Sequence, residues 1–355
     1  MAGWKAVLWG AIAAAGVGGV AGAARGQMVQ VNQQPPVLDR WMYNFNQTPG
    51  VEQNASVFTS LGDALQANFD DHDGQFLLGF DTVGTVPAGL PVAHYRIVSV
   101  QVVARNSRNL GFRYDPTYDG FATFLPVTDP AHVDDADLGR PIEMYGCGYR
   151  NGWTLGTFDQ AGPFCSPASA PTSCDYNSLP QRETRNVFAG EYDLAGQFVD
   201  VSNNISGATK FDPRPFAVGQ AAVTPGDLVP LNTDFTFNID LANAGVVRYL
   251  RECLAEGRVT LAITALAPAT QQGGNPPRFY TRQAFAQTLD PVRTPASLTL
   301  RVCVGPPGDW NCSGAKTVQD IFDFLAEWFG GNADFNSSGA TTVQDIFDFL
   351  AAWFS

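Results

Sequence analysis

The sequence contains little positive charge. Of its 355 residues, 21 are Lys or Arg and 34 are Asp or Glu, which gives a formal net charge of −13. Proteins that bind nucleic acid or anionic membranes need basic patches to meet phosphate groups, so we expect neither kind of partner here. The acidic balance instead fits an exported protein in a medium that contains salt and calcium.

Histidine is also scarce, and the common catalytic signatures are missing. The three histidines, at positions 72, 94 and 132, are scattered, and the chain has no H-E-x-x-H, G-x-S-x-G or G-x-x-x-x-G-K-[ST] segment. No two cysteines stand at C-x-x-C spacing, which argues against a zinc site. The sequence therefore identifies no catalytic residue. It leaves open whether the protein is an enzyme, and a non-enzyme is favoured.

Beyond the N-terminus, no apolar run is long enough to cross a bilayer. Residues 1–24 have the plan of a secretory signal peptide. Lys5 supplies the positive charge, residues 6–21 are apolar and rich in Ala and Gly, and Ala21-Gly22-Ala23 resembles a cleavage site. An uncleaved membrane anchor is the alternative. We expect the mature chain to be secreted or displayed at the cell surface, without a transmembrane segment.

Six cysteines in an exported chain suggest disulfides. Six cysteines allow 15 pairings, which spacing alone does not resolve, and a fully reduced set is the alternative. We predict Cys165–Cys174 within a loop rich in Pro and Ser. We also predict Cys303–Cys312, which would fasten a small C-terminal module to the rest of the chain, and Cys147 and Cys253 then remain as the third pair.

Residues 28–304 have the pattern of a β-rich body. Alternating or short apolar runs predict strands over 75–82, 95–104, 234–241, 258–266 and 296–304. Helical spacing predicts one helix over 242–256 that stops at Gly257. One helix among many strands, without βαβ alternation, predicts a β-sandwich. Residues 305–308, Gly-Pro-Pro-Gly, form a short linker, and a separate module begins at Asp309.

The C-terminal residues 309–355 contain one phrase twice. Residues 309–320 and 334–345 are loops with an oxygen-bearing side chain at positions one, three, five, nine and twelve and Gly at position six. This is the ligand spacing of an EF-hand calcium loop, although position twelve is Asp where EF-hands have Glu. With the main-chain carbonyl of position seven, the proposed ligands are Asp309, Asn311, Ser313, Ala315, Thr317 and Asp320 in loop one, and Asp334, Asn336, Ser338, Ala340, Thr342 and Asp345 in loop two.

A helix is predicted after each loop, because apolar residues recur there at helical spacing. Two such short helices can bury their apolar faces only against each other, which explains the duplication. Each loop has only two carboxylates, so we expect weak Ca²⁺ binding, with a dissociation constant of roughly 10⁻⁴–10⁻³ M. A helical hairpin that binds no metal is the alternative.

The repeats, and the segment DFNSSGATTVQDIFDFLAAWF in particular, resemble a dockerin, in the variant called the GC-type dockerin that ends many exported bacterial proteins. The resemblance covers residues 309–355. It implies Ca²⁺ binding and a role as a C-terminal anchoring or docking tag, with a cohesin-like protein or another surface receptor as the docking partner. Candidates for the docking face are Phe324, Trp328, Phe349 and Trp353, unless they form the core of the module.

One acidic cluster stands out in the body. Asp70, Asp71 and Asp73 lie just before the strand predicted at 75–82, and Asp81 lies near its end. A solvated turn, a structural metal site and a pair of catalytic acids for glycoside cleavage are three readings of this cluster. We expect the solvated turn, with the metal site as the next alternative.

The stretch from Phe76 to Ala104 resembles the DNRLRE-type family of exported jelly-roll domains, with a strand that ends in Phe-Asp, a Pro-Gly turn and a second strand, IVSVQVVA. The resemblance implies a carbohydrate-binding-like sandwich. Exposed aromatic rings are platforms for sugars. The candidates for ligand stacking are Trp41, Tyr43, Trp153, Phe279 and Tyr280, and the alternative places them in the core or at its rim.

The predicted fold is mainly β: an exported, jelly-roll-like β-sandwich with one helix, plus a small α-helical, dockerin-like module of two loop–helix repeats. The favoured function is non-enzymatic binding of polysaccharide or a cell-surface component, with the C-terminal module as the anchor. One alternative is an exported polysaccharide-degrading hydrolase or lyase whose acids the sequence does not assign. The other is a structural component of a surface layer or matrix.

Overall fold

A computed structural model of the protein describes residues 26–43, 46, 50–61, 69–161, 185–269, 273–331, 333–336 and 338–355. Within this part, the chain forms thirteen β-strands and four α-helices. The segment interpreted as a signal peptide, 1–24, lies outside it. None of the described helices has the length and apolar character needed to span a membrane.

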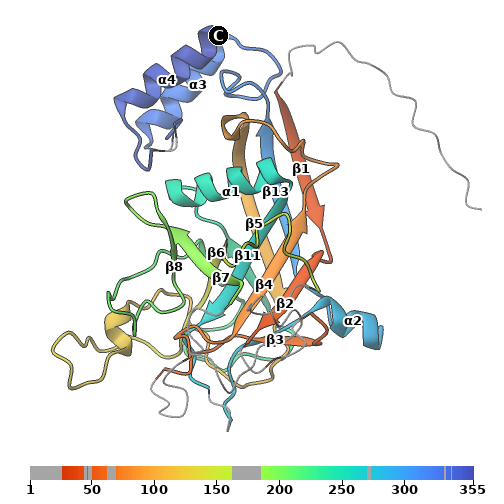
Figure 1. Cartoon of the computed structure of the whole chain (residues 1–355), viewed down its shortest axis with the longest axis vertical. Helices are drawn as coiled ribbons and strands as arrows, with labels where there is room; N and C mark the ends of the chain where they lie inside the picture. Colours follow the sequence, from red (N-terminus) through yellow and green to blue (C-terminus); the bar gives the residue numbers. More distant parts are fainter. Residues whose placement is uncertain are drawn as a thin grey trace, which may run out of the picture.

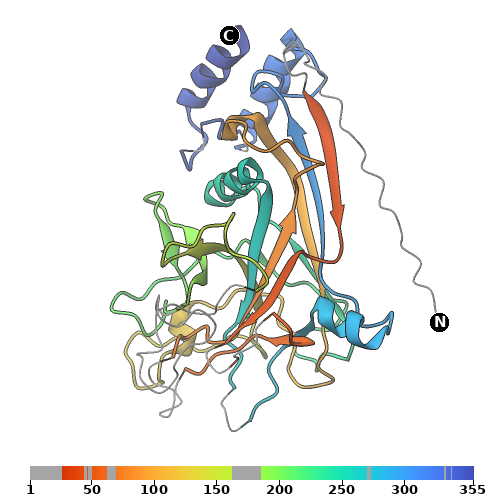
Figure 2. The ribbon, with the colours of Figure 1, turned by 45° about the vertical axis from the view of Figure 1, so that its right-hand side comes forward.

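Two antiparallel sheets face each other and form the body (Figures 1 and 2). The first has the order β1 (Gln27–Gln33), β13 (Ser297–Val304), β5 (Tyr95–Arg105), β10 (Asp234–Asn238). The second has the order β2 (Leu38–Met42), β4 (Gln75–Asp81), β11 (Arg258–Ala265), β6 (Ile142–Tyr149), β7 (Val187–Tyr192), β8 (Phe198–Asp200), with β9 (Ala217–Val218) paired to β6. A small third sheet pairs β12 (Arg278–Tyr280) with β3 (Asn54–Ser56). The mainly β, two-sheet architecture predicted from the sequence is confirmed.

The apolar core lies between the two main sheets. Phe76, Leu78 and Phe80 of β4 enter it together with Leu300 of β13. Leu77 lies on the other face of the second sheet and belongs to a separate apolar cluster there. Successive side chains of a strand point to opposite faces. Because both faces of β4 are covered, the strand has a continuous apolar sequence rather than an alternating one.

Helix α1 (Ala244–Glu256) contacts strands of both main sheets. The Asn243 side chain accepts a hydrogen bond from the Gly245 amide at its start, and Gly257 ends it with φ 86°, in the left-handed region that favours glycine. The predicted helix is confirmed. The prediction of only one helix in the body is wrong, because Thr281 caps a second helix, α2 (Arg282–Thr288). This helix buries only Ala284, so it has no apolar stripe that the sequence could show.

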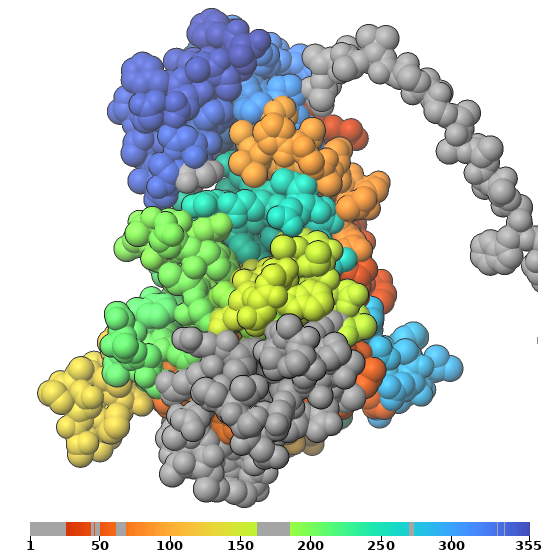
Figure 3. Space-filling model, viewed as in Figure 1, coloured from red at the N-terminus to blue at the C-terminus, as the bar shows by residue number. Residues whose placement is uncertain are grey.

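Helices α3 (Val318–Phe329) and α4 (Val343–Phe354) lie at one end of the body, beyond α1 (Figures 1 and 3). The chain reaches them from β13 through residues 305–308. Gly308 passes so close to α4 that a Cβ atom there would lie 2.7 Å from the Cα atom of Trp353. The linker is therefore packed against the C-terminal helices.

Candidate functional site

The two C-terminal loops have the same hydrogen bonds at the same positions. Asp309 Oδ1 accepts from the Ser313 amide at 3.0 Å, and its Oδ2 accepts from the Gly314 amide at 2.9 Å. In loop two, the Asp334 carboxylate accepts from the Ser338 and Gly339 amides at 2.9 and 2.8 Å. The repeat in sequence is thus a repeat in conformation.

Oxygen atoms gather in each loop. Ser313 Oγ lies 3.5 Å from Asp309 Oδ1 and 3.1 Å from the Ala315 carbonyl. In loop two, the Ser338 hydroxyl lies 3.5 Å from Asp334 Oδ1 and 3.3 Å from the Ala340 carbonyl. Positions one, five and seven therefore place their oxygens side by side, as a hard cation requires of its ligands.

Positions nine and twelve also begin the helices. Thr317 and Asp320 form a capping box at the start of α3, and Thr342 and Asp345 form the same box at α4. The second oxygen of each Asp reaches back to position three: Asp320 Oδ1 accepts from the Asn311 amide at 2.9 Å, and Asp345 Oδ1 does so in loop two. Capping accounts for Thr and Asp at these positions without a metal, but it does not account for the oxygens gathered at positions one, five and seven.

Of the four aromatic residues expected at a docking face, Phe324 and Phe349 form the core of the module, and Trp328 and Trp353 pack against that core, half-buried. Phe324 and Phe349 are both 0% exposed, and their rings stack with centroids 4.2 Å apart. The indole of Trp328 donates to the Thr342 carbonyl at 2.7 Å, and that of Trp353 donates to the Thr317 carbonyl at 3.0 Å. Each repeat thus holds the helix start of the other. The prediction of a docking role is wrong for the buried Phe324 and Phe349, whereas the half-buried Trp328 and Trp353 stay candidates.

A different set of apolar side chains covers the outside of the module. Phe322 and Phe347, which occupy the same position in the two repeats, are 62% and 61% exposed. Two further equivalent pairs are also exposed, Val318 with Val343 and Phe329 with Phe354. We call these six residues the paired apolar surface. On each helix the three positions are four and seven residues apart, so they lie along one face of that helix. Large exposed apolar groups of this kind make the surface a candidate interaction site.

The module is fastened to the body by covalent and charged contacts. The predicted disulfide Cys303–Cys312 is present and joins the end of β13 to loop one. The guanidinium of Arg96 on β5 lies 5.1 Å from the ring centre of Trp310 and 3.6 Å from the Glu327 carboxylate of α3. The other cysteine predictions have different outcomes. Cys147 and Cys253 are free and buried, so their predicted pairing is wrong, and Cys165 and Cys174 lie outside the described residues.

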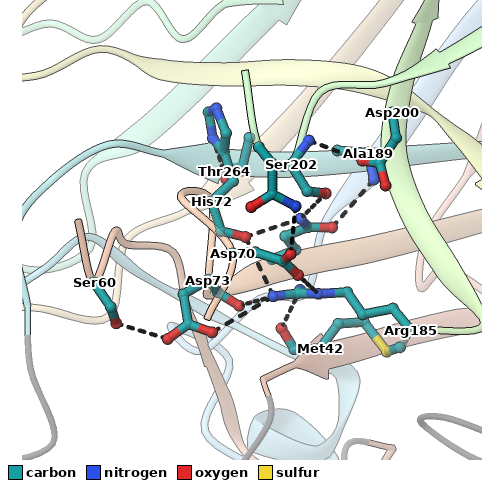
Figure 4. A network of polar contacts seen from close by, with 12 residues as sticks. Met42, Ser60, Asp70, His72, Asp73, Arg185, Ala189, Asp200, Ser202 and Thr264 are labelled. Atoms are coloured by element: carbon teal, nitrogen blue, oxygen red, sulfur yellow. Dashed lines mark hydrogen bonds and ion pairs between the residues drawn. The ribbon is translucent and has the colours of Figure 1, made fainter. Parts of the chain in front are cut away.

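The acidic cluster before β4 is buried rather than solvated (Figure 4). The Arg185 side chain runs between the carboxylates, with Nε 2.7 Å from Asp70 Oδ2 and Nη2 3.6 Å from Asp73 Oδ1. Its guanidinium also donates to main-chain carbonyls, at 3.1 Å to Met42 and 3.3 Å to His72. The expectation of a solvated turn is therefore wrong. A guanidinium occupies the place among the carboxylates that the alternative prediction gave to a metal.

The remaining acidic groups of this network have partners of their own. Asp71 Oδ2 accepts from the amides of Ile205 and Ser206 at 2.9 and 2.8 Å, and Asp73 Oδ2 accepts from the Ser60 hydroxyl at 2.7 Å. Asp81 lies at the far end of β4 and pairs with Arg258. The four carboxylates therefore do not form one metal site.

The five aromatic residues proposed for sugar stacking do not form a platform. Phe279 stacks on Phe76 within the core, and Tyr280 is buried, so the prediction of exposed rings is wrong for these two. Trp41 and Tyr43 stack on each other, half-buried, with ring centres 5.2 Å apart. Trp153 is also half-buried and packs against Phe158, with ring centres 5.6 Å apart.

A groove of about 690 Å³ lies elsewhere on the body, and no sequence pattern predicted it. Its walls include Tyr118, Asp212, Arg214 and Arg248, and loop two of the C-terminal module contributes Ser338–Ala340 to its rim. The Tyr118 hydroxyl donates to Asp212 Oδ1 at 3.2 Å. The residues that line the groove come from distant parts of the chain, so no local motif could have revealed the groove.

Two buried glutamates belong to the same region. Glu191 Oε2 lies 3.6 Å from Nε of Arg214, which lines the groove, and burial raises the pKa of Glu191 to about 7. Burial also raises the pKa of Glu143 to about 8, and Tyr145 donates a hydrogen bond to Glu143 Oε2 at 3.0 Å. Carboxyl groups that hold a proton near neutral pH are able to act as general acids.

Comparison with models of known protein families and with curated proteins finds no match for this chain. The assignment of a function therefore rests on the geometry of the C-terminal loops, the paired apolar surface and the groove.

Proposed function

We propose that the protein is exported and that a C-terminal, dockerin-like module, which binds Ca²⁺, anchors its β-sandwich body. The observation that carries this proposal is the repeated loop, in which oxygens of positions one, five and seven gather at the same place in both copies. Both loops keep the same oxygen-bearing residues and the same internal hydrogen bonds, which supports a common ligand for the two copies. Oxygen-only ligands favour calcium among the common cations.

The paired apolar surface is the proposed contact with the docking partner, a cohesin-like protein or another surface receptor. Phe322 and Phe347 stand on the exposed faces of α3 and α4 while Phe324 and Phe349 hold the helices together. The helices therefore expose large apolar groups that the module's own core does not use. Calcium would fix the start of both helices and so set the spacing of this surface.

Calcium titration of the full mature chain tests the module. We expect far-UV circular dichroism to show a gain in helix content, and a concentration ten times the dissociation constant to stabilise the module by about 1.4 kcal/mol per site. Asp309→Asn with Asp334→Asn should abolish both effects, whereas Asp290→Asn, at an exposed carboxylate of the body, should change neither. Identical spectra in excess calcium and in EDTA would contradict the proposal.

The body is proposed to bind a polysaccharide or a cell-surface component in the groove. Tyr118 offers a partly exposed ring, and Asp212, Arg214 and Arg248 offer hydrogen-bonding groups, which is the mixture that sugar hydroxyls and ring faces need. Depletion of the protein from solution by a panel of polysaccharides measures this. We expect selective depletion by the wild type and by Trp153→Ala, and its loss in Tyr118→Ala.

The second candidate function is polysaccharide cleavage, and the raised pKa values of Glu191 and Glu143 favour it. An acid of this kind next to a groove suits glycoside hydrolysis. Release of reducing sugar that is lost in Glu191→Gln would support the enzyme. Binding without release would support the binding module, and neither binding nor release would favour a structural role in a surface layer or matrix.

A further inference from the structure

The long connection between β5 and β6 contains a second sequence with metal-ligand spacing. Asp115, Thr117 and Asp119 are alternate residues followed by Gly120, which matches positions one, three, five and six of a calcium loop. The connection forms the extended yellow segment at the lower left of Figure 1. Its start is fixed by main-chain hydrogen bonds. The Tyr114 amide donates to the Asp227 carbonyl at 2.9 Å, and the Gly226 amide donates to the Tyr114 carbonyl at 2.8 Å.

A third carboxylate returns to this loop from further along the chain. Oxygens of Asp115, Asp119 and Asp137 all lie within 4.8 Å of one another. Thr117 Oγ1 lies between two of them, 2.8 Å from Asp115 Oδ1 and 2.9 Å from Asp137 Oδ2. Oxygens bound to one Ca²⁺ at about 2.3–2.6 Å are at most about 5 Å apart, so the three carboxylates are close enough to share one such ion. Calcium is favoured over magnesium because its ligand geometry is flexible, whereas Mg²⁺ demands a nearly ideal octahedron.

The hydrogen bonds of the cluster are incomplete. Asp115 is 3% exposed, and its Oδ2 atom is buried without any hydrogen-bond partner. The Thr117 hydroxyl has one proton, so it can serve only one of the two carboxylates that it contacts. A buried carboxylate oxygen without a partner is costly, and this cost is of the kind that a cation removes.

The cationic neighbour of the cluster is already shared. Nη1 of Arg140 lies 2.7 Å from Asp119 Oδ2 and 2.8 Å from Asp135 Oδ2. This single positive charge pairs with one carboxylate of the cluster, Asp119, and with one outside it, Asp135. It forms no ion pair with Asp115 or Asp137. Burial raises the pKa of Glu143 nearby, and the negative charges of Asp119 and Asp115 raise it further.

We propose that Asp115, Thr117, Asp119 and Asp137 form a Ca²⁺ site in the body, separate from the C-terminal loops. The site supplies three carboxylates and one hydroxyl, and water completes the six to eight oxygens that calcium takes. Tyr118 stands between two of the ligands and lines the groove. Calcium at this site therefore fixes one wall of the groove, and it does so whether or not the C-terminal module binds metal.

Hydrogen–deuterium exchange of the full mature chain locates the effect. Exchange is compared in EDTA and in about 5 mM CaCl₂, above the range of roughly 10⁻⁴–10⁻³ M expected for weak extracellular sites. We expect calcium to slow exchange in peptides from residues 113–140 of the wild type. Asp137→Asn should lose most of this effect, because it removes one of the three negative charges of the site at an exposed position. The matched variant Asp134→Asn, at a fully exposed carboxylate of the same loop, should keep it.

Each outcome decides the matter. No calcium-dependent change in peptides 113–140 of the wild type, or an equal change in Asp137→Asn, would overturn the site. An equal effect of MgCl₂ would overturn the assignment of calcium. Peptides from residues 309–355 report on the C-terminal loops in the same experiment, so slowing there alone refutes the body site and leaves the proposed module function standing.

Discussion

Replacing Arg185 by Met is the sharpest test of how the body manages its buried charges. Arg185 is 1% exposed and holds Asp70 by a 2.7 Å contact, while Asp73 lies 3.6 Å away. Met fills much of the same space without charge. It leaves two buried carboxylates without their cation, and it removes the hydrogen bonds that Arg185 donates to the main-chain carbonyls of Met42 and His72. Removing one partner of a buried ion pair costs about 3–5 kcal/mol.

Thermal and denaturant unfolding of the full chain measures this cost. In a protein of this size, about 3–5 kcal/mol corresponds to a fall of roughly 4–7 °C in Tm. Arg293→Met is the control, because Arg293 pairs with Asp290 at the surface, where ion pairs contribute about 0–1 kcal/mol. Adding Asp70→Asn to Arg185→Met should recover part of the loss, since it removes one uncompensated charge. If Arg185→Met destabilises the protein no more than Arg293→Met, the network does not stabilise the body as described.

Three further predictions follow from single residues. Burial raises the pKa of Glu143 from 4.5 to about 8, so the folded state binds this proton more tightly than the unfolded state does. The resulting stability is fully present below about pH 4.5 and is lost as the pH rises through about 8. Denaturation across this range should therefore show a fall in the free energy of unfolding that is smaller in Glu143→Gln, where Glu191, with its pKa raised to about 7, still contributes. Cys312→Ser should destabilise the module by about 2–3 kcal/mol through loss of loop closure, visible as faster hydrogen exchange in residues 309–355 with an unchanged body. Phe349→Ala should cost about 3–5 kcal/mol and unfold the module, whereas the exposed Phe347→Ala should stay within about 0.5 kcal/mol of wild type and weaken only partner binding, as unfolding and pull-down assays will show.

The strands that the sequence revealed are those whose burial follows a simple period. The predictions at 75–82, 95–104, 258–266 and 296–304 match β4, β5, β11 and β13 to within a residue or two at each end. In β10 and β5, apolar and polar residues alternate because one face lies in the core. Strands β6 and β7 were missed. Both contain Gly and buried polar residues, which hide the period.

The role of the acidic cluster could not be read from its neighbourhood in the sequence. Asp70 and its partner Arg185 are separated by 115 positions, and three adjacent acidic residues look like a surface turn until their partner is known. The same holds for Phe322 and Phe324. Helical spacing indicates that both lie on an amphipathic helix, but only the second repeat, stacked on the first, decides which ring is buried.

The body site was within reach of the sequence in part. The pattern D-x-T-x-D-G at residues 115–120 has the spacing that identified the C-terminal loops. It was harder to see because it occurs once, because Thr replaces a carboxylate, and because only a short 3₁₀ helix, Phe121–Phe124, follows it. Its closing ligand, Asp137, is remote in sequence and comes from a loop without regular structure. A duplicated motif is recognised by its repetition. A single motif is recognised only when the fold places its last ligand beside the others.

The protein places carboxylates out of water in three ways, and the comparison bears on where calcium binds. The charge of Asp70 is neutralised by the Arg185 guanidinium, which takes the position that a metal would occupy. Asp320 and Asp345, at the helix starts, are met by main-chain amides, which neutralise them only in part. Asp115 has one oxygen with no partner at all. The attraction of a site for a cation grows with the negative charge that the protein leaves uncompensated. The body site should therefore bind calcium more tightly than either C-terminal loop. In a calcium titration followed by hydrogen exchange, residues 113–140 should be protected at a lower calcium concentration than residues 309–355. The reverse order would mean that Arg140 compensates the body site more fully than its contacts suggest.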